Sequence, residues 1–357
     1  MPTPNTFSSL GLRAELLGNL AEIDYREMTL VQAETLPRVL AGSDVLARAK
    51  TGSGKTAAFG LGVLNKLQTD AFRVQALVLC TTRELADQVA REIRRLARSL
   101  PNIKILTLCG GAPMGGQLAS LQHSPHIIVG TPGRVLKHLG KGTVDLANLQ
   151  TLVLDEADRM LDMGFSDELD AILTFVPAKR QTLLFSATYP EAIAAISDKV
   201  QRDAIIIDVT DDEQAAQITQ YWCEVTRENR CADLLGTIRE WGGALNLVFC
   251  NTKIDCADVA VYLKANGIVG LALHGDLDQN QRNEVLVRFA NRSASVLIAT
   301  DVAARGLDVD DIDAVFNYEL PPQPEVYTHR IGRTARAGKK GLAVSLVEPR
   351  EARRLLD

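Results

Sequence analysis

The chain has 357 residues, which is the length of about two ordinary domains. With 46% hydrophobic and 23% charged residues, each half can form an apolar core, which excludes a disordered chain, a collagen-like fibre and a small disulfide-stabilised protein. Its 39 basic and 44 acidic residues give a net charge of −5, so the overall charge does not indicate a nucleic-acid-binding protein.

The six cysteines form no CxxC pair, and the N-terminal segment has no cationic stretch followed by an apolar one. We therefore expect reduced thiols and no secretory signal peptide. No apolar run approaches the roughly 20 residues of a membrane-spanning helix. Together these features predict a soluble, cytoplasmic protein.

Short apolar runs alternate with helical patterns along the first part of the chain. Continuous apolar strands separated by helices are typical of a parallel sheet that is buried on both faces. One helix is predicted within residues 81–100, ended by Pro101. The predicted strands are Val45–Ala47, Ala76–Cys80, Ile105–Cys109, His126–Gly130, Thr151–Asp155, Gln181–Phe185 and Ala204–Val209.

This alternation stops at Val209–Gln217, a polar, acidic stretch without periodicity, and then resumes. Helices are predicted near Asp255–Ala265 and Gln279–Ala290. The chain is therefore predicted to fold as two α/β domains in tandem, joined by a short linker. The strands predicted for the second domain are Leu245–Cys250, Ile268–Leu273, Val296–Ala299, Ala314–Asn317 and Ala343–Val347.

A glycine-rich segment follows the first predicted strand and precedes a helical run, which is the context of a phosphate-binding loop. Lys55 can reach the β- and γ-phosphates of a nucleotide, and the Thr56 hydroxyl can bind Mg²⁺. The general pattern GxxxxGK[ST] has glycine where this chain has Ala49, so the match is incomplete at its first position. The residues predicted to bind the nucleotide here are Ala49, Lys50, Thr51, Gly52, Ser53, Gly54, Lys55 and Thr56.

A second motif, Asp155-Glu156-Ala157-Asp158, follows the strand Thr151–Asp155. Parallel sheets bind ligands at the carboxyl ends of their strands, so Asp155 is predicted to hold Mg²⁺ and Glu156 to activate the attacking water. Taken alone, the same acidic run also fits the N-terminus of a helix.

These motifs, in this order, resemble those of the DEAD-box RNA helicases of superfamily 2, and the similarity extends over essentially the whole chain. The resemblance implies an ATP-dependent RNA helicase with two RecA-like domains. The implied boundaries are 1–33 for an N-terminal Q-motif segment, 34–208 for the first RecA-like domain, 209–217 for the linker and 218–357 for the second.

In the Q motif that this resemblance implies, Gln32 recognises the adenine edge of ATP and Phe7 packs on the base. An amide can bond both the N6 amino group and N7 of adenine, which favours ATP over GTP. This chain departs from the family pattern at two positions of this loop, where Asp24 replaces the usual glycine and Leu30 the usual proline.

Further site residues follow from the resemblance. Asp158, Ser186, Thr188 and His329 are expected to couple the ATP site to RNA, and Asp308 to contact the ribose. Arg333 and Arg336, placed three residues apart on one helical face, are expected to act as arginine fingers on the γ-phosphate. Ala335 replaces the family's usual glycine, which we expect to be tolerated. Because these arginines lie in the second domain, hydrolysis is expected to require closure of the two domains over ATP, gated by RNA.

The predicted RNA-binding residues follow strands or begin helices, where ligands bind in such sheets. Singly, each also fits a turn or a helix cap. The motif Thr81–Leu85 has threonine in place of the family's first proline. Since few of these side chains recognise bases, the core is expected to grip the RNA backbone with little sequence preference. The residues are Arg83, Gly111, Thr131, Arg134, Asn251, Thr252, Gln279, Arg282 and Thr300.

Within the family, several stretches are most similar to the bacterial DbpA subgroup. Its members carry a C-terminal RNA-binding domain that directs them to large-subunit ribosomal RNA. We expect this chain to be a monomeric helicase core without that domain. An ATP-gated RNA clamp and a DNA translocase remain as alternatives. The net charge of −5 then indicates weak, switchable RNA binding rather than no RNA binding.

Overall fold

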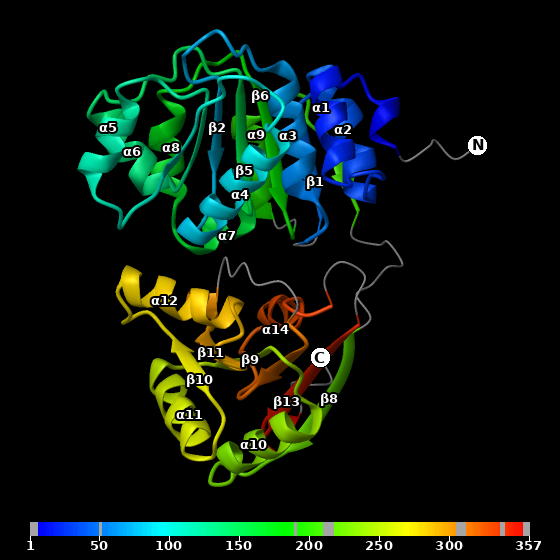
Figure 1. Cartoon of the computed structure of the whole chain (residues 1–357), viewed down its shortest axis with the longest axis vertical. Helices are drawn as coiled ribbons and strands as arrows, with labels where there is room; N and C mark the ends of the chain where they lie inside the picture. The colour runs from blue at the N-terminus through cyan, green and yellow to red at the C-terminus, as the bar shows by residue number, and fades with distance from the viewer. Residues whose placement is uncertain are drawn as a thin grey trace. The chain divides into compact units, whose positions relative to one another are not determined.

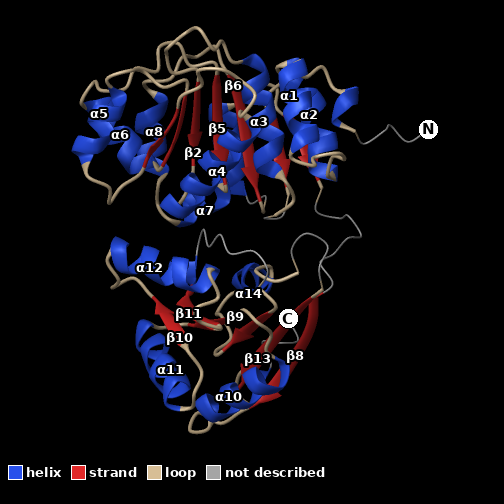
Figure 2. Cartoon of the chain, in the orientation of Figure 1, coloured by secondary structure: helices blue, strands red, loops and turns tan. Residues whose placement is uncertain are grey.

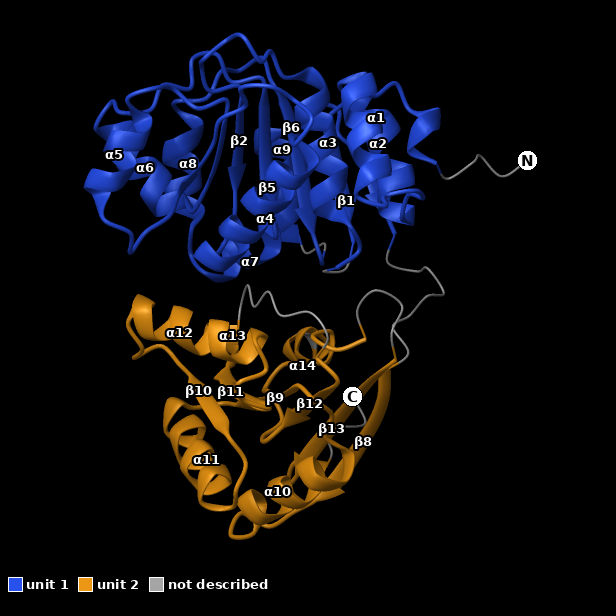
Figure 3. Ribbon diagram, in the orientation of Figure 1, with its two compact units in different colours: residues 1–211 blue, residues 212–357 orange. Residues whose placement is uncertain are grey.

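In a computed structural model, residues 6–49, 52–188, 191–209, 218–304, 312–335 and 340–352 are described. The chain divides into two compact units, residues 1–211 (unit 1) and 212–357 (unit 2), which Figure 3 shows in separate colours. Each unit is an α/β layer structure built on one parallel sheet (Figures 1 and 2).

The sheet of unit 1 has seven strands in the order β3-β4-β2-β5-β6-β1-β7, all paired in parallel. Because every strand runs the same way, their carboxyl ends share one edge of the sheet. The strands are β1 (Val45–Arg48), β2 (Ala76–Leu79), β3 (Ile105–Leu108), β4 (Ile127–Gly130), β5 (Thr151–Asp155), β6 (Gln181–Ser186) and β7 (Ile205–Asp208).

Alternate residues of these strands enter two apolar cores on opposite faces of the sheet, as on β5, where Val153 joins one core and Leu152 the other. The first face is covered by α1 (Ala14–Glu22), α2 (Leu30–Ala41), α3 (Lys55–Lys66) and α4 (Arg83–Leu96), and a short 3₁₀ helix spans Phe7–Ser9. The second is covered by α5 (Met114–Leu121), α6 (Pro132–Gly140), α7 (Ala157–Asp162), α8 (Ser166–Leu173) and α9 (Glu191–Val200).

Unit 2 has a six-stranded parallel sheet in the order β10-β11-β9-β12-β13-β8. Its strands are β8 (Ile218–Glu224), β9 (Asn246–Cys250), β10 (Gly270–Leu273), β11 (Val296–Thr300), β12 (Ala314–Asn317) and β13 (Gly341–Val347). Its helices are α10 (Arg230–Trp241), α11 (Lys253–Ala265), α12 (Gln279–Ala290), α13 (Asp301–Ala304) and α14 (Pro324–Ile331). Helices α10 and α11 pack on one face of the sheet, and α12 and α13 on the other.

The predicted fold class is confirmed, and each strand predicted from an apolar run is present to within about two residues at either end. Strand β8 was missed because most of its side chains are exposed at the edge of the sheet. All six cysteines are free, as expected. Among the described residues, none of the helices has the length and apolar character to cross a membrane.

Candidate active site

The phosphate loop lies where the sequence predicts it, between β1 and α3. Gly52 and Gly54 have φ angles of 84° and 91°, a left-handed conformation that glycine adopts without strain. Lys55 is the first residue of α3, and its buried Nζ donates a hydrogen bond of 3.0 Å to the carbonyl of Ala49. The side chain is thereby folded over the loop, at the helix N-terminus that favours anions.

The start of α2 contacts this loop at Ser53 and Gly54, while Lys50 and Thr51 lie outside the described residues. The Gln32 amide nitrogen donates to the carbonyl of Gly54 at 3.1 Å, and the Thr29 hydroxyl donates to the carbonyl of Ser53 at 2.8 Å. Gln32 is 2% exposed. The start of α2 therefore supports the phosphate loop directly.

The Q-motif loop keeps its shape despite both substitutions. Asp24 has φ 61°, so the aspartate adopts the left-handed conformation that a glycine would favour. Leu30 is the first residue of α2, where proline is common, but the helix start is secured by a capping box between Thr29 and Gln32. Phe7 is 3% exposed and packs 6.0 Å from the Tyr25 ring, so it offers little surface to a base.

Asp155 ends β5 with one oxygen, Oδ1, buried and without a hydrogen-bond partner. Burial, together with the nearby Glu156, raises the pKa of this carboxyl to about 6, against the attraction of Lys55. A bare carboxylate oxygen beside a phosphate loop fits Mg²⁺, which proteins hold with one or two carboxylates and the substrate phosphates. Thr56, at the start of α3, would add its hydroxyl.

Glu156 is held in an unusual backbone conformation, with φ 55° and ψ 50° at the N-cap of α7. Such a conformation costs a non-glycine residue about 1–2 kcal/mol and is found at functional sites. Its Oε2 accepts a hydrogen bond of 3.3 Å from the Thr81 hydroxyl and lies 3.5 Å from Nη1 of Arg159. All three side chains are buried.

Asp158, the last acid of the run, ties α7 to the segment that follows β6. Its Oδ2 accepts hydrogen bonds from the Thr188 hydroxyl at 3.0 Å and from the backbone N–H groups of Thr188 and Ala187 at 3.0 and 3.2 Å. The Ser186 hydroxyl is buried without a partner. The structure therefore brings Asp158, Ser186 and Thr188 together. The fourth predicted coupling residue, His329, lies in unit 2.

Sheet order explains why these motifs meet although they are far apart in sequence. Strands β2, β5, β6 and β1 are consecutive neighbours in the sheet, and all are parallel. Thr81, the acidic run, Ser186 and the phosphate loop follow these four strands, so they lie along the same edge. Ligands bind at this edge in open α/β sheets.

On the proposed RNA path of unit 1, Arg83 and Gly111 are brought into contact. Gly111 has φ 77°, which favours glycine, and a side chain there would force the Arg83 guanidinium to move aside. The guanidinium of Arg134 donates to the carbonyl of Ala112 at 2.9 Å and to Oε1 of Gln117 at 2.7 Å. Arg134 therefore also supports the backbone of this segment. Thr131 is the N-cap residue of α6.

In unit 2, Arg330 organises the predicted RNA-binding segments. It is 1% exposed, and its guanidinium makes five hydrogen bonds, including two of 2.7 Å to Asp301 and one of 2.7 Å to Oδ1 of Asn251. The Asn251 amide also donates to the carbonyl of Leu320 at 3.2 Å. Sequence analysis gave Arg330 no role, although its place between His329 and Arg333 was a signal.

The other predicted RNA-binding residues of unit 2 lie at helix starts and strand ends, as expected. Thr252 caps α11 by accepting from the N–H of Asp255. Gln279 begins α12, Arg282 donates to the carbonyl of Ala303 at 2.6 Å, and Thr300 ends β11.

The expected placement of the arginine fingers on one helical face is wrong. Helix α14 ends at Ile331 with Gly332 as its C-cap, so Arg333 lies in the turn that follows. Arg336 and Asp308 lie outside the described residues. Ala335 has φ 56°, a left-handed conformation that the family's glycine adopts freely and alanine does not. The substitution is accommodated, but at a cost in backbone strain.

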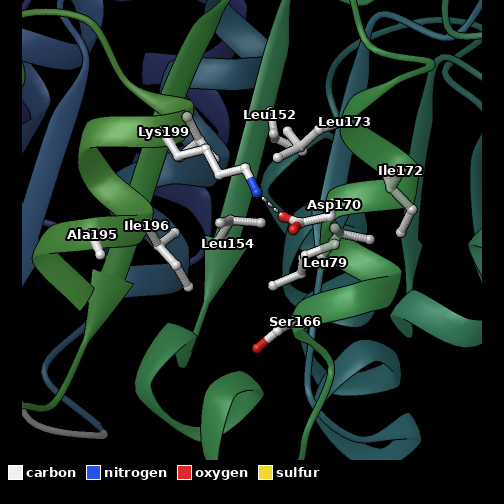
Figure 4. A pocket seen from close by; sticks show the side chains of 12 residues that line it. Leu79, Leu152, Leu154, Ser166, Asp170, Ile172, Leu173, Ala195, Ile196 and Lys199 are labelled. Atoms are coloured by element: carbon white, nitrogen blue, oxygen red, sulfur yellow. Dashed lines mark hydrogen bonds and ion pairs between the residues drawn. The ribbon is translucent and has the colours of Figure 1, made fainter. Parts of the chain in front are cut away.

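A separate apolar cavity of about 220 Å³ lies between α8, α9 and the sheet of unit 1 (Figure 4). Leu152, Leu154 and Ile172 line it, and an ion pair between Lys199 and Asp170 lies at its side. A triphosphate needs several hydrogen-bond donors, which this lining does not supply. The cavity is therefore not the nucleotide site.

A phosphate loop, a buried carboxylate at the next strand but one and a second parallel-sheet unit define a nucleotide hydrolase of the P-loop class. Comparison with known proteins narrows this class. The family model for the DEAD/DEAH box helicase matches residues 29–196, and that for the helicase conserved C-terminal domain matches residues 228–338.

The chain is 58% identical to the ATP-dependent RNA helicase DbpA of Escherichia coli, over 98% of this chain and 76% of that protein. It is 44% identical to the DEAD-box ATP-dependent RNA helicase CshA of Bacillus cereus, over 98% and 67%. Among solved structures, Saccharomyces cerevisiae Dbp5 bound to RNA and ADP BeF3 matches with a TM-score of 0.89 and 29% identity, over 99% and 92%. The chain belongs to the DEAD-box family of ATP-dependent RNA helicases and is similar to its DbpA subgroup.

Proposed function

We propose that this protein hydrolyses ATP in response to RNA and uses the reaction to separate short RNA duplexes locally and non-processively. In this proposal Lys55 binds the phosphates, Thr56 and Asp155 hold Mg²⁺, and Glu156 activates the attacking water. Gln32 recognises the adenine edge, whereas Phe7, which is buried against Tyr25, has little surface left for the base. Arg333 and Arg336 act on the γ-phosphate, and Asp308 contacts the ribose.

The single observation that carries the proposal is the state of the acidic run in unit 1. Asp155 keeps a buried oxygen without a partner, Glu156 has a strained backbone, and Asp158 is fully engaged with the segment after β6. A run that served only as a helix N-terminus would need none of these features. Strain and desolvated carboxylates are features of catalytic sites.

We further propose that residues 34–208 and 218–357 work as two RecA-like domains, with 1–33 as the Q-motif segment and 209–217 as the linker. Of that linker, only Val209 lies within the described residues. Closure of the domains on ATP and RNA would bring Arg333 and Arg336 to the phosphates and would make hydrolysis depend on RNA. His329 would join the coupling groups of the first domain.

The RNA would be held by its backbone, through Arg83 and the other strand-end residues named above. The solved relative from yeast is bound to RNA and ADP BeF3, which supports RNA and ATP as the two ligands. From the resemblance to the DbpA subgroup we infer ribosomal RNA and large-subunit assembly as the context in which this enzyme works. We propose a cytoplasmic enzyme that acts as a monomer.

A duplex-release experiment tests this proposal. A short labelled RNA duplex with a single-stranded extension is incubated with the protein and ATP, a non-hydrolysable ATP analogue, or no nucleotide. Multiple-turnover strand release with ATP is expected, and at most a single round with the analogue. Equal release with both would favour an ATP-gated clamp, and equal ATPase stimulation by DNA and RNA would favour a DNA translocase.

A further inference from the structure

The side chain of Thr81 contacts the proposed catalytic glutamate, across two adjacent strands. Thr81 follows β2, Glu156 follows β5, and these strands are neighbours. The Thr81 hydroxyl donates to Oε2 of Glu156 at 3.3 Å, and Thr81 is 3% exposed, so solvent does not compete for the bond. A buried hydroxyl aimed at a carboxylate restricts how that carboxylate can rotate.

This contact belongs to this chain and not to the family's usual motif. The family has proline where this chain has Thr81, and proline has no side-chain donor. The contact is therefore an addition to the site and not a requirement of the reaction. It connects Glu156 to the loop that carries Arg83, on the proposed RNA path, because Thr82 caps α4 and Arg83 begins it.

The neighbouring strands hold the acidic run from both sides. On the β6 side, Asp158 is bonded to the Thr188 segment, and on the β2 side Glu156 is bonded to Thr81. Arg159 approaches the same oxygen of Glu156 at 3.5 Å. These two contacts of Glu156 use the same oxygen, Oε2, so the carboxylate is held through that oxygen.

We propose that Thr81 is a positioning residue for ATP hydrolysis, which fixes the carboxylate of Glu156 for water activation. This inference rests on the proposed role of Glu156. In this role Thr81 acts through Glu156 and not by a contact of its own with ATP or the reacting water. Its loss should therefore slow the chemical step and leave substrate binding unchanged.

The experiment compares Thr81→Val, which removes only the hydroxyl, with Thr81→Ser, which keeps it, in the full chain with saturating RNA. We expect Thr81→Val to lower kcat about fivefold with KM for ATP within twofold, as for the loss of one modest hydrogen bond to a charged group. Thr81→Ser should restore most of kcat. In a Glu156→Gln background, Thr81→Val should cause no further loss, because the two residues act as one unit.

A matched control is Thr182→Val on β6. Thr182 is as deeply buried as Thr81, but its hydroxyl has no hydrogen-bond partner, so kcat should not change. An unchanged kcat in Thr81→Val, an equal loss in Thr182→Val, or a Thr81→Ser variant as slow as Thr81→Val would overturn the inference. Failure of the proposed function would be seen separately, as full turnover in Glu156→Gln alone.

Discussion

The two units have the same architecture, but the acidic run of unit 1 and the buried Arg330 of unit 2 are bonded to their surroundings in different ways. In unit 1, the strand edge carries Asp155 and Ser186 with buried atoms that have no partner, and Glu156 with a strained backbone. In unit 2, the corresponding edge is organised by Arg330, whose five hydrogen bonds join Asn251 and Asp301 to the sheet. Asp155 and Ser186 of unit 1 thus keep polar atoms that a ligand can bond, whereas the charges around Arg330 in unit 2 are bonded to one another.

The same edge of a parallel sheet can therefore carry reactive groups or hold the surrounding segments in place. Unsatisfied buried groups reduce stability, and proteins retain them where function needs them. A buried, fully bonded arginine fixes the geometry of the segments around it. Substitutions at the phosphate site of unit 1 should therefore act mainly on ATP turnover. Substitution of Arg330 in unit 2 should act mainly on the free energy of unfolding.

The largest effect is expected for Lys55→Ala in unit 1. Removal of the phosphate cation should lower RNA-stimulated ATP turnover about a thousandfold with the fold intact. Steady-state phosphate release measures the effect, with circular dichroism to check the fold. Lys199→Ala, which removes one member of a half-exposed ion pair, is the matched control and should keep turnover within twofold.

The second effect tests unit 2. Arg330→Met keeps the side-chain volume but leaves Asp301 without its partner, which should lower the free energy of unfolding of this unit by about 3–5 kcal/mol. Hydrogen exchange of amides in β9 and β11 would report it. Arg288→Met on exposed α12 should cost less than about 0.5 kcal/mol. Equal losses in both variants would contradict the role given to Arg330.

A smaller effect, on the free energy of unfolding, is expected for Asp155→Asn. It is measured in buffer with a chelator, so that no metal ion binds Asp155. The folded-state pKa of Asp155, about 6, is above its unfolded value, so the wild type binds more protons when folded. Its stability contribution is fully present below about pH 4 and is lost as the pH rises through about 6. The Asn variant should therefore match the wild type at low pH and exceed it by about 3 kcal/mol at pH 7 in urea unfolding. A pH-independent difference would refute this account.

The smallest effect concerns backbone strain. Ala335→Gly should stabilise unit 2 by about 1 kcal/mol, because glycine adopts the left-handed φ of 56° without a side-chain clash. Asp24→Gly in unit 1, at φ 61°, should change stability by only a few tenths of a kcal/mol, since aspartate tolerates this conformation. A destabilised Ala335→Gly variant would show that backbone strain at Ala335 is not what decides the effect of this substitution on stability.

The sequence predicted the buried framework well because its signal is local. Continuous apolar runs located the interior strands, and the phosphate loop and the acidic run were recognised from neighbouring residues alone. The edge strand β8 was not predicted, since its exposed residues, such as Tyr221 and Trp222, form no apolar run. The end of α14 could have been predicted from Gly332, which stops the helix before Arg333.

The remaining features depend on contacts between distant residues. Thr81 was visible as a departure from the family's proline, but its partner Glu156 is 75 residues away. Arg330 meets Asn251 across 79 residues, and no local pattern shows which side chain a buried guanidinium will contact. Likewise, Gln32 was predicted to recognise adenine, but its bond to the phosphate loop required the packing of α2 against α3.

The most direct test of the central claim is ATP turnover by the wild type and by Glu156→Gln, each with and without saturating single-stranded RNA. We expect RNA to stimulate the wild type strongly, and the variant to bind ATP and RNA but lose nearly all turnover. Absence of RNA stimulation in the wild type, or full turnover in the variant, would contradict the assignment of this site as an RNA-dependent ATPase.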